Sequence, residues 1–322
     1  MSFKALCKFT LLATHVVAGL ATPLDRRAAD DELVATPAGL VPKSNVHAVP
    51  AGATVQQSSA EVQIVAANGT VLHSVPFSGV KGASPLPTPP ATSTTKRDLP
   101  MGYLAYAYWL NDSPNPISFF GTNWNVPPIP ASWDGQLLYW FNGLEPATGD
   151  AILQPVLQYG VSPAGGGEFY SVASWWLVDN NVFHTDITQV APGTFLQGQM
   201  TLTGTSTSGG VTTYSYESTF VGIPASTISA TSTEALNWAF EALEIYTTVS
   251  LSDLPTGNTV FSKVDLTLSI GQNPPPFLGP QSVILLTELP WQSSIIRELV
   301  AHLSSRIRLM GIESEGFDLL AN

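Results

Sequence analysis

The chain has 322 residues, a formal net charge of −12 at pH 7 and one cysteine, Cys7. Such an acidic chain repels nucleic acid and anionic membranes, so we expect neither as a partner. Between Asp98 and Arg297 there is one histidine, His184, one basic residue, Lys263, and no cysteine. This inventory excludes thiol catalysis and thiolate metal sites from the span, and we expect no metal and no cofactor.

Residues 1–21 are typical of a secretory signal peptide. Lys4 and Lys8 give a positive start, and an apolar run, too short for a confident membrane span, follows from Phe9 to Leu20. We therefore expect a secreted, extracellular protein, and because Cys7 lies inside the signal we expect no disulfide in the mature chain. The excess of carboxylates suits an acidic medium, in which the surface approaches neutrality.

Residues 22–97 form a predicted pro-segment. They are rich in Ala, Pro, Thr, Ser and Val and end at the dibasic pair Lys96-Arg97, which we interpret as a cleavage site for a processing protease. Within them, Asn68-Gly69 separates two runs that contain β-branched residues, a pattern that predicts a hairpin and a partly folded segment. We expect the pro-segment to keep the mature domain silent until cleavage.

Residues 98–290 are expected to form an all-β domain. Short runs rich in Val, Thr, Tyr, Trp and Phe recur between breaks of Gly, Pro, Asn and Asp. This pattern predicts a concanavalin-like or jelly-roll β-sandwich of two antiparallel sheets, which we expect to be a monomer. Loops are expected at 163–167 and 204–210. The predicted strands are 103–110, 119–126, 136–142, 152–159, 170–178, 194–203, 212–221 and 260–270.

Two regions toward the C-terminal end need separate treatment. Residues 231–246 fit either an amphipathic helix, with Leu236, Phe240 and Leu243 on one face, or a strand. Residues 291–322 form a tail, in which 294–310 predicts a short amphipathic C-terminal helix. We assign no function to this tail.

Four islands between Trp124 and Glu244 carry a family resemblance. They are Asn125-Val126-Pro127, the spacing from Trp140 to the glutamine of Ala151-Ile152-Leu153-Gln154, then Val190-Ala191-Pro192-Gly193-Thr194, and Trp238-Ala239-Phe240-Glu241. In this order they resemble the fungal glutamic peptidases, the eqolisin family. The resemblance covers a little over a third of the chain. It implies a concanavalin-like sandwich and a secreted, acid-active endopeptidase that acts on polypeptides.

The resemblance implies that Gln154 and Glu241 form a catalytic dyad. A carboxylate can act as general base on a water that attacks a peptide carbonyl and then return the proton to the leaving amine. A neutral amide beside it can stabilise the developing oxyanion. This chemistry needs no His, Cys, Lys or metal, which agrees with the composition. We expect Trp140, Gln158 and Trp176 to line the substrate site, with Gln158 on the same side of a strand as Gln154.

The sequence departs from the family at its supporting positions. The aspartate that follows the tryptophan in the family has no counterpart in residues 141–145, and two acidic residues of a later strand are absent from residues 170–176. The family's cysteines are absent as well. The resemblance therefore supports the fold more than the activity.

Three other functions remain open at this level. The chain could be a non-catalytic concanavalin-like module that binds glycan or cell-wall material on a tryptophan-lined face. It could be a carbohydrate-active hydrolase that uses Glu241 and Glu244 as paired carboxylates. It could also place His184, beside Asp186, in a triad with a serine, although the sequence has no nucleophile-elbow glycine pattern.

Overall fold

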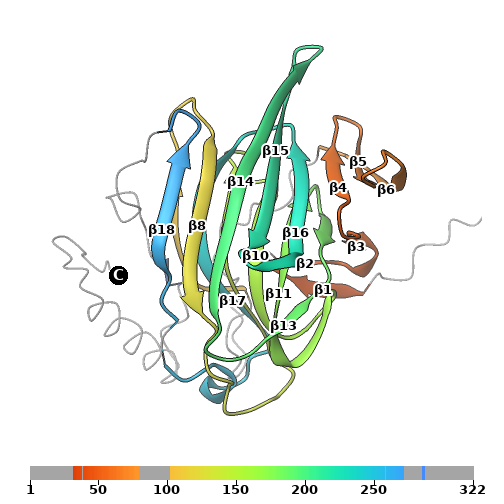
Figure 1. Ribbon diagram of the computed structural model, residues 1–322. Coiled ribbons are helices and arrows are strands. Elements are labelled where there is room, and N and C mark those ends of the chain that lie inside the picture. Colours follow the sequence, from red (N-terminus) through yellow and green to blue (C-terminus); the bar gives the residue numbers. More distant parts are fainter. Residues whose placement is uncertain (1–31, 38, 80–101, 258, 272–284, 287–322) are drawn as a thin grey trace, which may run out of the picture. The chain divides into compact units, whose positions relative to one another are not determined.

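The computed structural model describes residues 32–37, 39–79, 102–257, 259–271 and 285–286 (Figure 1). The predicted signal peptide, the Lys96-Arg97 site and the predicted C-terminal helix lie outside the described residues. Within the described ranges, no helix is long and apolar enough to cross a membrane.

Two large β-sheets contain most of the described residues. In the first sheet the strand order is β19-β7-β17-β9-β10-β11-β12-β3, with β13 paired to β11. In the second sheet the order is β18-β8-β14-β15-β16-β4-β5-β6. The first sheet consists of β3 (Val46–Ala48), β7 (Gly102–Leu110), β9 (Leu137–Pro146), β10 (Ala151–Ser162), β11 (Gly165–Val178), β12 (Asn181–His184), β13 (Thr188–Val190), β17 (Leu236–Tyr246) and β19 (Leu285–Leu286). The second consists of β4 (Thr54–Gln57), β5 (Glu61–Val65), β6 (Val71–Pro76), β8 (Ile117–Asn125), β14 (Phe195–Ser208), β15 (Val211–Phe220), β16 (Ile223–Ser232) and β18 (Ser262–Leu268).

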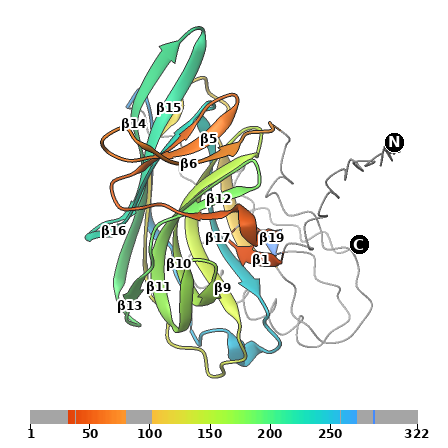
Figure 2. The ribbon, with the colours of Figure 1, turned by 90° about the vertical axis from the view of Figure 1, so that its right-hand side faces the viewer.

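The two sheets pack face to face as two layers, and the view in Figure 2 shows β9, β10 and β17 beside β14, β15 and β16. An apolar core fills the space between them, with side chains such as Trp124, Trp176 and Phe220 fully buried. Hydrogen bonds also cross the core, as where the Ser218 hydroxyl donates to the Ser174 oxygen at 3.1 Å. The predicted all-β sandwich is confirmed.

A two-stranded hairpin, separate from both sheets, covers part of the first sheet. It consists of β1 (Leu33–Thr36) and β2 (Gly39–Pro42), and we call it the occluding hairpin. Val41 of this hairpin belongs to an apolar cluster with Phe141, Trp175 and Tyr246 of the first sheet. The hairpin contributes to the burial of β9, because Tyr139 of that strand donates to the Ala35 carbonyl and lies in the same apolar cluster as Val41.

The predicted strands agree with the observed ones, and the loops are shorter than expected. The predicted loop at 163–167 is a turn at residues 163–164, and the loop at 204–210 is a turn at residues 209–210. Gly209 and Gly210 both have positive φ, 59° and 82°, as a two-residue hairpin turn requires. β16 was not predicted, because its sequence is mostly Ser, Thr, Ala and Pro and has only Ile223 and Ile228 as large apolar residues.

The ambiguous stretch at 231–246 is a strand from residue 236 onward. β17 pairs with β7 on one side and with β9 on the other, so its backbone groups are satisfied in the middle of a sheet. Helical periodicity in this stretch is overridden by tertiary pairing, since aromatic and apolar side chains occur on both of its faces.

The N-terminal segment, residues 32–79, contributes strands to both sheets. β3 pairs in parallel with β12 at the edge of the first sheet, and β4 pairs in parallel with β16 in the second. The hairpin predicted around Asn68-Gly69 is present as β5 and β6. The sandwich is therefore not confined to residues 98–290, because it includes strands from the predicted pro-segment. Cleavage at Lys96-Arg97 remains a prediction.

Candidate functional site

The first sheet has two faces, and strand register assigns each candidate residue to one of them. We call the face toward the second sheet the inner face and the opposite one the outer face. Gln154 lies directly opposite Trp175 on the neighbouring strand, and Val156 lies opposite Phe141. Residues directly opposite in an antiparallel pair share a face, and alternate residues along a strand do too. Gln154, Trp175, Val156 and Phe141 therefore share the outer face.

Glu241 lies on the inner face. It is opposite Asn142, the neighbour of Phe141 on the same strand, and so points the other way. Its Oε1 accepts a hydrogen bond of 2.8 Å from the Thr122 hydroxyl of the second sheet. Asn142 in turn donates to the Gly198 carbonyl at 3.2 Å. Burial raises the pKa of Glu241 to about 7, an effect that the hydrogen bond from Thr122 partly offsets.

The predicted dyad of Gln154 and Glu241 is therefore wrong in its geometry. The two side chains leave the sheet on opposite faces, with the backbone of the sheet between them. The sequence island around Glu241 gave the right strand but not the direction of the side chain, because one residue of register reverses the face. Glu241 and Glu244, three residues apart, also point to opposite faces, which argues against the paired-carboxylate site of a glycosidase.

Glu244 is the glutamate of β17 that shares the outer face with Gln154. It lies opposite Tyr139, which lies opposite Gln158 on β10. The hydroxyl of Tyr246 donates to Oε1 of Glu244. Burial and the nearby Glu244 carboxylate raise the pKa of Tyr139 and Tyr246 well above the ordinary phenol value. Both phenols therefore stay protonated and can donate hydrogen bonds.

Three consecutive carbonyls of the occluding hairpin meet this outer face. The Gln154 amide donates from Nε2 to the carbonyl of Pro37. The hydroxyl of Tyr246 lies 3.2 Å from the carbonyl oxygen of Thr36, and Tyr139 donates at 3.1 Å to that of Ala35. The outer face thus contacts the backbone of the hairpin at the end of β1 and in the turn that follows it.

Gln154 itself is an unusual side chain in an apolar setting. It is fully buried, and among the described residues its Oε1 has no hydrogen-bond partner. A buried amide left half satisfied costs free energy, so a donor or a ligand atom at this oxygen would be stabilising. The bond to Pro37 satisfies only the nitrogen end.

The predicted substrate residues have structural roles. Trp140 and Trp176 are buried on the inner face, in the core clusters that contain Leu157 and Leu153 respectively. They do not line the outer face, and the prediction that they wall the site is wrong. The tryptophan that does lie beside Gln154 is Trp175.

Gln158 is on the outer face, as predicted, but its groups hold a hairpin together. Its Nε2 donates to the carbonyls of Gly160 and Gly165, and its Oε1 accepts from Ser162. The register shifts between Tyr159 and Gly160. The amide of Gln158 bridges the chain where the regular ladder is interrupted, so its role is to hold a bulge.

Glu145 is a carboxyl on the outer face that sequence reasoning did not single out. It lies opposite Trp238 on β17 and is 3% exposed. Within the described part of the chain, its Oε2 has no hydrogen-bond partner, and burial raises its pKa to about 8. Alternate residues of a strand share a face, so Glu145 takes the same face as Phe141 and Gly143. The register of β9 was the signal that could have identified it as an outer-face carboxyl.

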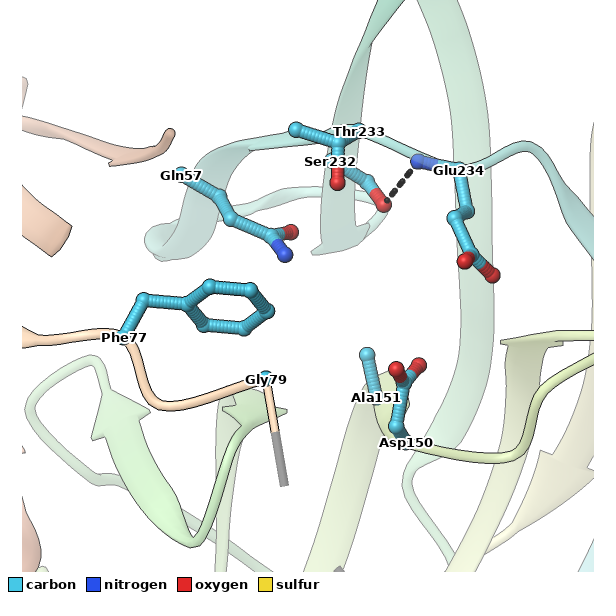
Figure 3. Close-up of a pocket in the computed structure, with 8 residues that line it drawn as sticks. All are labelled: Gln57, Phe77, Gly79, Asp150, Ala151, Ser232, Thr233 and Glu234. Carbon is cyan, nitrogen blue, oxygen red and sulfur yellow. Dashed lines mark hydrogen bonds between the residues drawn. The ribbon is translucent and has the colours of Figure 1, made fainter. Parts of the chain in front are cut away.

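His184 also shares the outer face, because it lies opposite Trp175 on β11 with the two ring centres 5.0 Å apart. His184 has its Nδ1 2.9 Å from the Thr185 carbonyl oxygen, an arrangement that does not engage a serine. A pocket of about 190 Å³ lies elsewhere, where Gln57, Phe77, Asp150 and Glu234 line it (Figure 3). Among the described residues, no group of three or more His, Cys, Asp or Glu side chains could hold a metal ion.

Comparison with known proteins gives a slight structural likeness. No family model and no curated protein matches the chain. Two solved structures of scytalido-glutamic peptidase with transition-state analogues are 15% and 14% identical, cover 53% and 57% of this chain and 82% and 87% of theirs, and give TM-scores of 0.34 and 0.35. SCP-B, an eqolisin peptidase in complex with the tripeptide Ala-Ile-His, is 15% identical, with coverages of 53% and 82% and a TM-score of 0.32. A likeness of this size carries no functional argument.

Proposed function

We propose that the protein is a secreted, acid-active endopeptidase of the glutamic type whose catalytic carboxyl is Glu244 and whose Gln154 amide binds the substrate backbone on the same outer face. The observation that carries the proposal is the hairpin segment 35–37, which lies on this face with its Ala35 and Pro37 carbonyls bound by Tyr139 and Gln154 and its Thr36 carbonyl 3.2 Å from the Tyr246 hydroxyl. The face that binds a peptide backbone also carries a carboxyl. The family resemblance of the sequence supplies the reaction class.

The chemistry assigns a separate role to each group. The Glu244 carboxylate takes a proton from water, and the resulting hydroxide attacks the carbonyl carbon of the bound peptide. Register places Gln154 two strands and four residues away from Glu244, so its amide holds a different carbonyl of the substrate, as it holds that of Pro37. Tyr139, which lies opposite Glu244, donates its hydroxyl to the oxyanion of the tetrahedral intermediate. The Glu244 carboxyl then gives its proton to the leaving nitrogen as the C–N bond breaks. Tyr246 orients Glu244, because its hydroxyl donates to that carboxylate.

The test compares the two glutamates of β17 directly. Glu244→Gln is expected to lower the rate of hydrolysis of an unfolded protein at pH 4 by about 10² to 10³-fold, the usual effect of losing a catalytic base. Gln154→Ala is expected to raise KM, because the Gln154 amide binds the substrate backbone. Glu241→Gln is the matched control and is expected to keep the wild-type rate. The rate is measured as release of new amino termini, with circular dichroism as a check on folding.

The opposite pattern would overturn the assignment. If Glu241→Gln abolishes hydrolysis while Glu244→Gln retains it, the inner-face carboxyl is the reactive one and the geometric argument fails. Glu145→Gln is a third arm, since Glu145 also lies on the outer face. A selective loss in that variant would move the role of the carboxyl from Glu244 to Glu145.

A second candidate is a non-catalytic binding module. The observation that favours it is burial, because Gln154 and Glu244 are 0% and 1% exposed beneath other side chains. Hydrolysis needs a water molecule at the carboxyl, and a site as closed as this one could bind a ligand and still exclude that water. Retention of an extended peptide or a glycan by the wild-type protein, with no turnover after acid treatment, would support the module over the enzyme.

A further inference from the structure

The occluding hairpin continues directly into the edge strand that anchors it. A 3-10 turn, η1 (Lys43–Asn45), joins β2 to β3. β3 pairs with β12 through residues 46–48, and Val49 donates its N–H to the His184 carbonyl at 2.8 Å. Movement of the hairpin away from Gln154 therefore depends on how firmly β3 is held against β12.

Two histidines of the N-terminal segment meet where this edge strand is held. The ring of His47 on β3 lies 4.5 Å, centre to centre, from the ring of His73 on β6. His47 also contacts Phe183 of β12 at 5.1 Å, and its Nε2 lies 3.4 Å from the side-chain oxygen of Asn181. A third histidine, His184, lies one residue beyond Phe183. The chain has five histidines, and three of them are at this junction.

The groups around His47 do little to neutralise a charge on it. Asn181 is uncharged, and His73 and His184 act on His47 as like charges. The two carboxyls near β12 interact with other groups. Asp179 accepts hydrogen bonds from Ser78, and the charge of Asp186 acts on His184. Glu61 of β5 accepts a hydrogen bond from Ser74, which follows His73 in the chain. Ser74 and His73 point to opposite faces of the β5–β6 hairpin, so Glu61 lies on the face away from His73.

We propose that His47 and His73 form an acid-sensitive latch that holds the N-terminal segment and its occluding hairpin over the outer face. His184, the neighbour of Phe183 on β12, points to the opposite face of the sheet from His47. At neutral pH the ring of His47 packs against the ring of His73, tilted by 40°, and β3 stays paired. In acid a positive charge on the half-buried His47 ring is unfavourable against the imidazole of His73, and the released strand uncovers Gln154 and Glu244. The proposed function explains what the latch is for. The release of the segment itself does not depend on that function and can be measured separately.

The direction of the pH effect follows from linkage. Burial lowers the pKa of His47 from 6.5, as do His73 and His184, while Asn181 raises it. A histidine whose pKa is lower when the segment is docked than when it is free binds more protons in the released state. Docking therefore weakens as pH falls below about 6.5, the pKa of a free histidine.

Hydrogen–deuterium exchange on the full chain tests the latch. Amide protection of residues 33–48 is measured from pH 7.5 to pH 4.5 and corrected for the intrinsic pH dependence of exchange. We expect at least a ten-fold loss of protection in the wild type as the pH falls, with β10 as an internal reference that stays protected. His47→Phe keeps an aromatic ring against Phe183 but cannot be charged, and is expected to retain protection in acid.

His73→Gln gives the second variant, because His73 is exposed and its replacement does not disturb the core. It is expected to shift the loss of protection to lower pH. Constant protection of residues 33–48 in the wild type overturns the latch, as does an unchanged pH profile in both variants. A latch that opens without any hydrolysis would instead refute the proposed function and leave the latch standing.

Discussion

The two faces of the first sheet give their glutamates different hydrogen-bond partners. On the inner face, Glu241 receives a hydrogen bond from Thr122 and is enclosed by the second sheet. On the outer face, Glu244 is bonded to Tyr246, which also contacts the backbone of the occluding hairpin. Both glutamates are buried, so burial alone does not distinguish a structural carboxyl from a candidate reactive one.

The difference lies in what covers each face. The inner face is covered by a sheet whose strands are paired on both sides, and opening it would break the core of the sandwich. The outer face at Gln154 is contacted by a two-stranded hairpin that is bonded to neither sheet as a strand. Local opening costs far less free energy than global unfolding. The proposed function requires a ligand to displace only the hairpin, whereas access to the inner face would require separation of the two sheets.

The largest expected effect on stability concerns the charge of Glu241. Its raised pKa means that the folded state binds more protons than the unfolded state between pH 4.5 and about 7. The free energy of unfolding therefore falls as pH rises through this window, by about 3 kcal/mol at 1.36 kcal/mol per pKa unit. Glu241→Gln is expected to remove this loss and to raise the stability at pH 8 while changing little at pH 4.

Urea denaturation at the two pH values measures this effect. Glu168→Gln is the control, because Glu168 is exposed and its loss should leave the pH profile unchanged. An identical pH profile for Glu241→Gln and the wild type would contradict the placement of Glu241 in the core.

A pair of glycines compares how closely each face is packed. A Cβ at Gly198 would lie 2.9 Å from atoms of both Pro155 and Trp124, which are rigid or enclosed, so Gly198→Ala is expected to cost about 1–3 kcal/mol. A Cβ at Gly143 would meet the far end of the Phe240 ring at 2.6 Å on the outer face. That ring can turn toward the hairpin, so Gly143→Ala is expected to cost less. Equal melting temperatures for the two variants would show that both faces are equally rigid.

The smallest expected effect is the loss of the hydroxyl that contacts Glu241. Thr122→Val keeps the shape of the side chain but removes the 2.8 Å hydrogen bond to the carboxylate. We expect a loss of about 1–2 kcal/mol, larger at pH 8 than at pH 4, because a hydrogen bond to an ionised group is the stronger one. Thr219→Val is the control. It removes a hydrogen bond between the hydroxyls of Thr219 and Thr227, neither of which is ionised, and should show no such pH dependence.

The sequence by itself determined the class of fold and most of its strands. Alternating apolar residues and turn glycines define strands locally, and this is why most predicted strands are confirmed. The same local information placed Gln154 on strand β10, but it left the stretch around Glu241 open between a helix and a strand. It also found the hairpin around Asn68-Gly69, because the Asn-Gly pair suits a tight turn.

Only the tertiary structure decided which side chains meet. Register between distant strands sends Glu241 inward and Glu244 outward, and a shift of one residue would exchange them. The covering of the outer face by residues 35–37, and the meeting of His47 with His73, depend on contacts between parts of the chain that lie far apart in sequence. Such contacts follow from the packing of the whole chain, and no local pattern of residues encodes them.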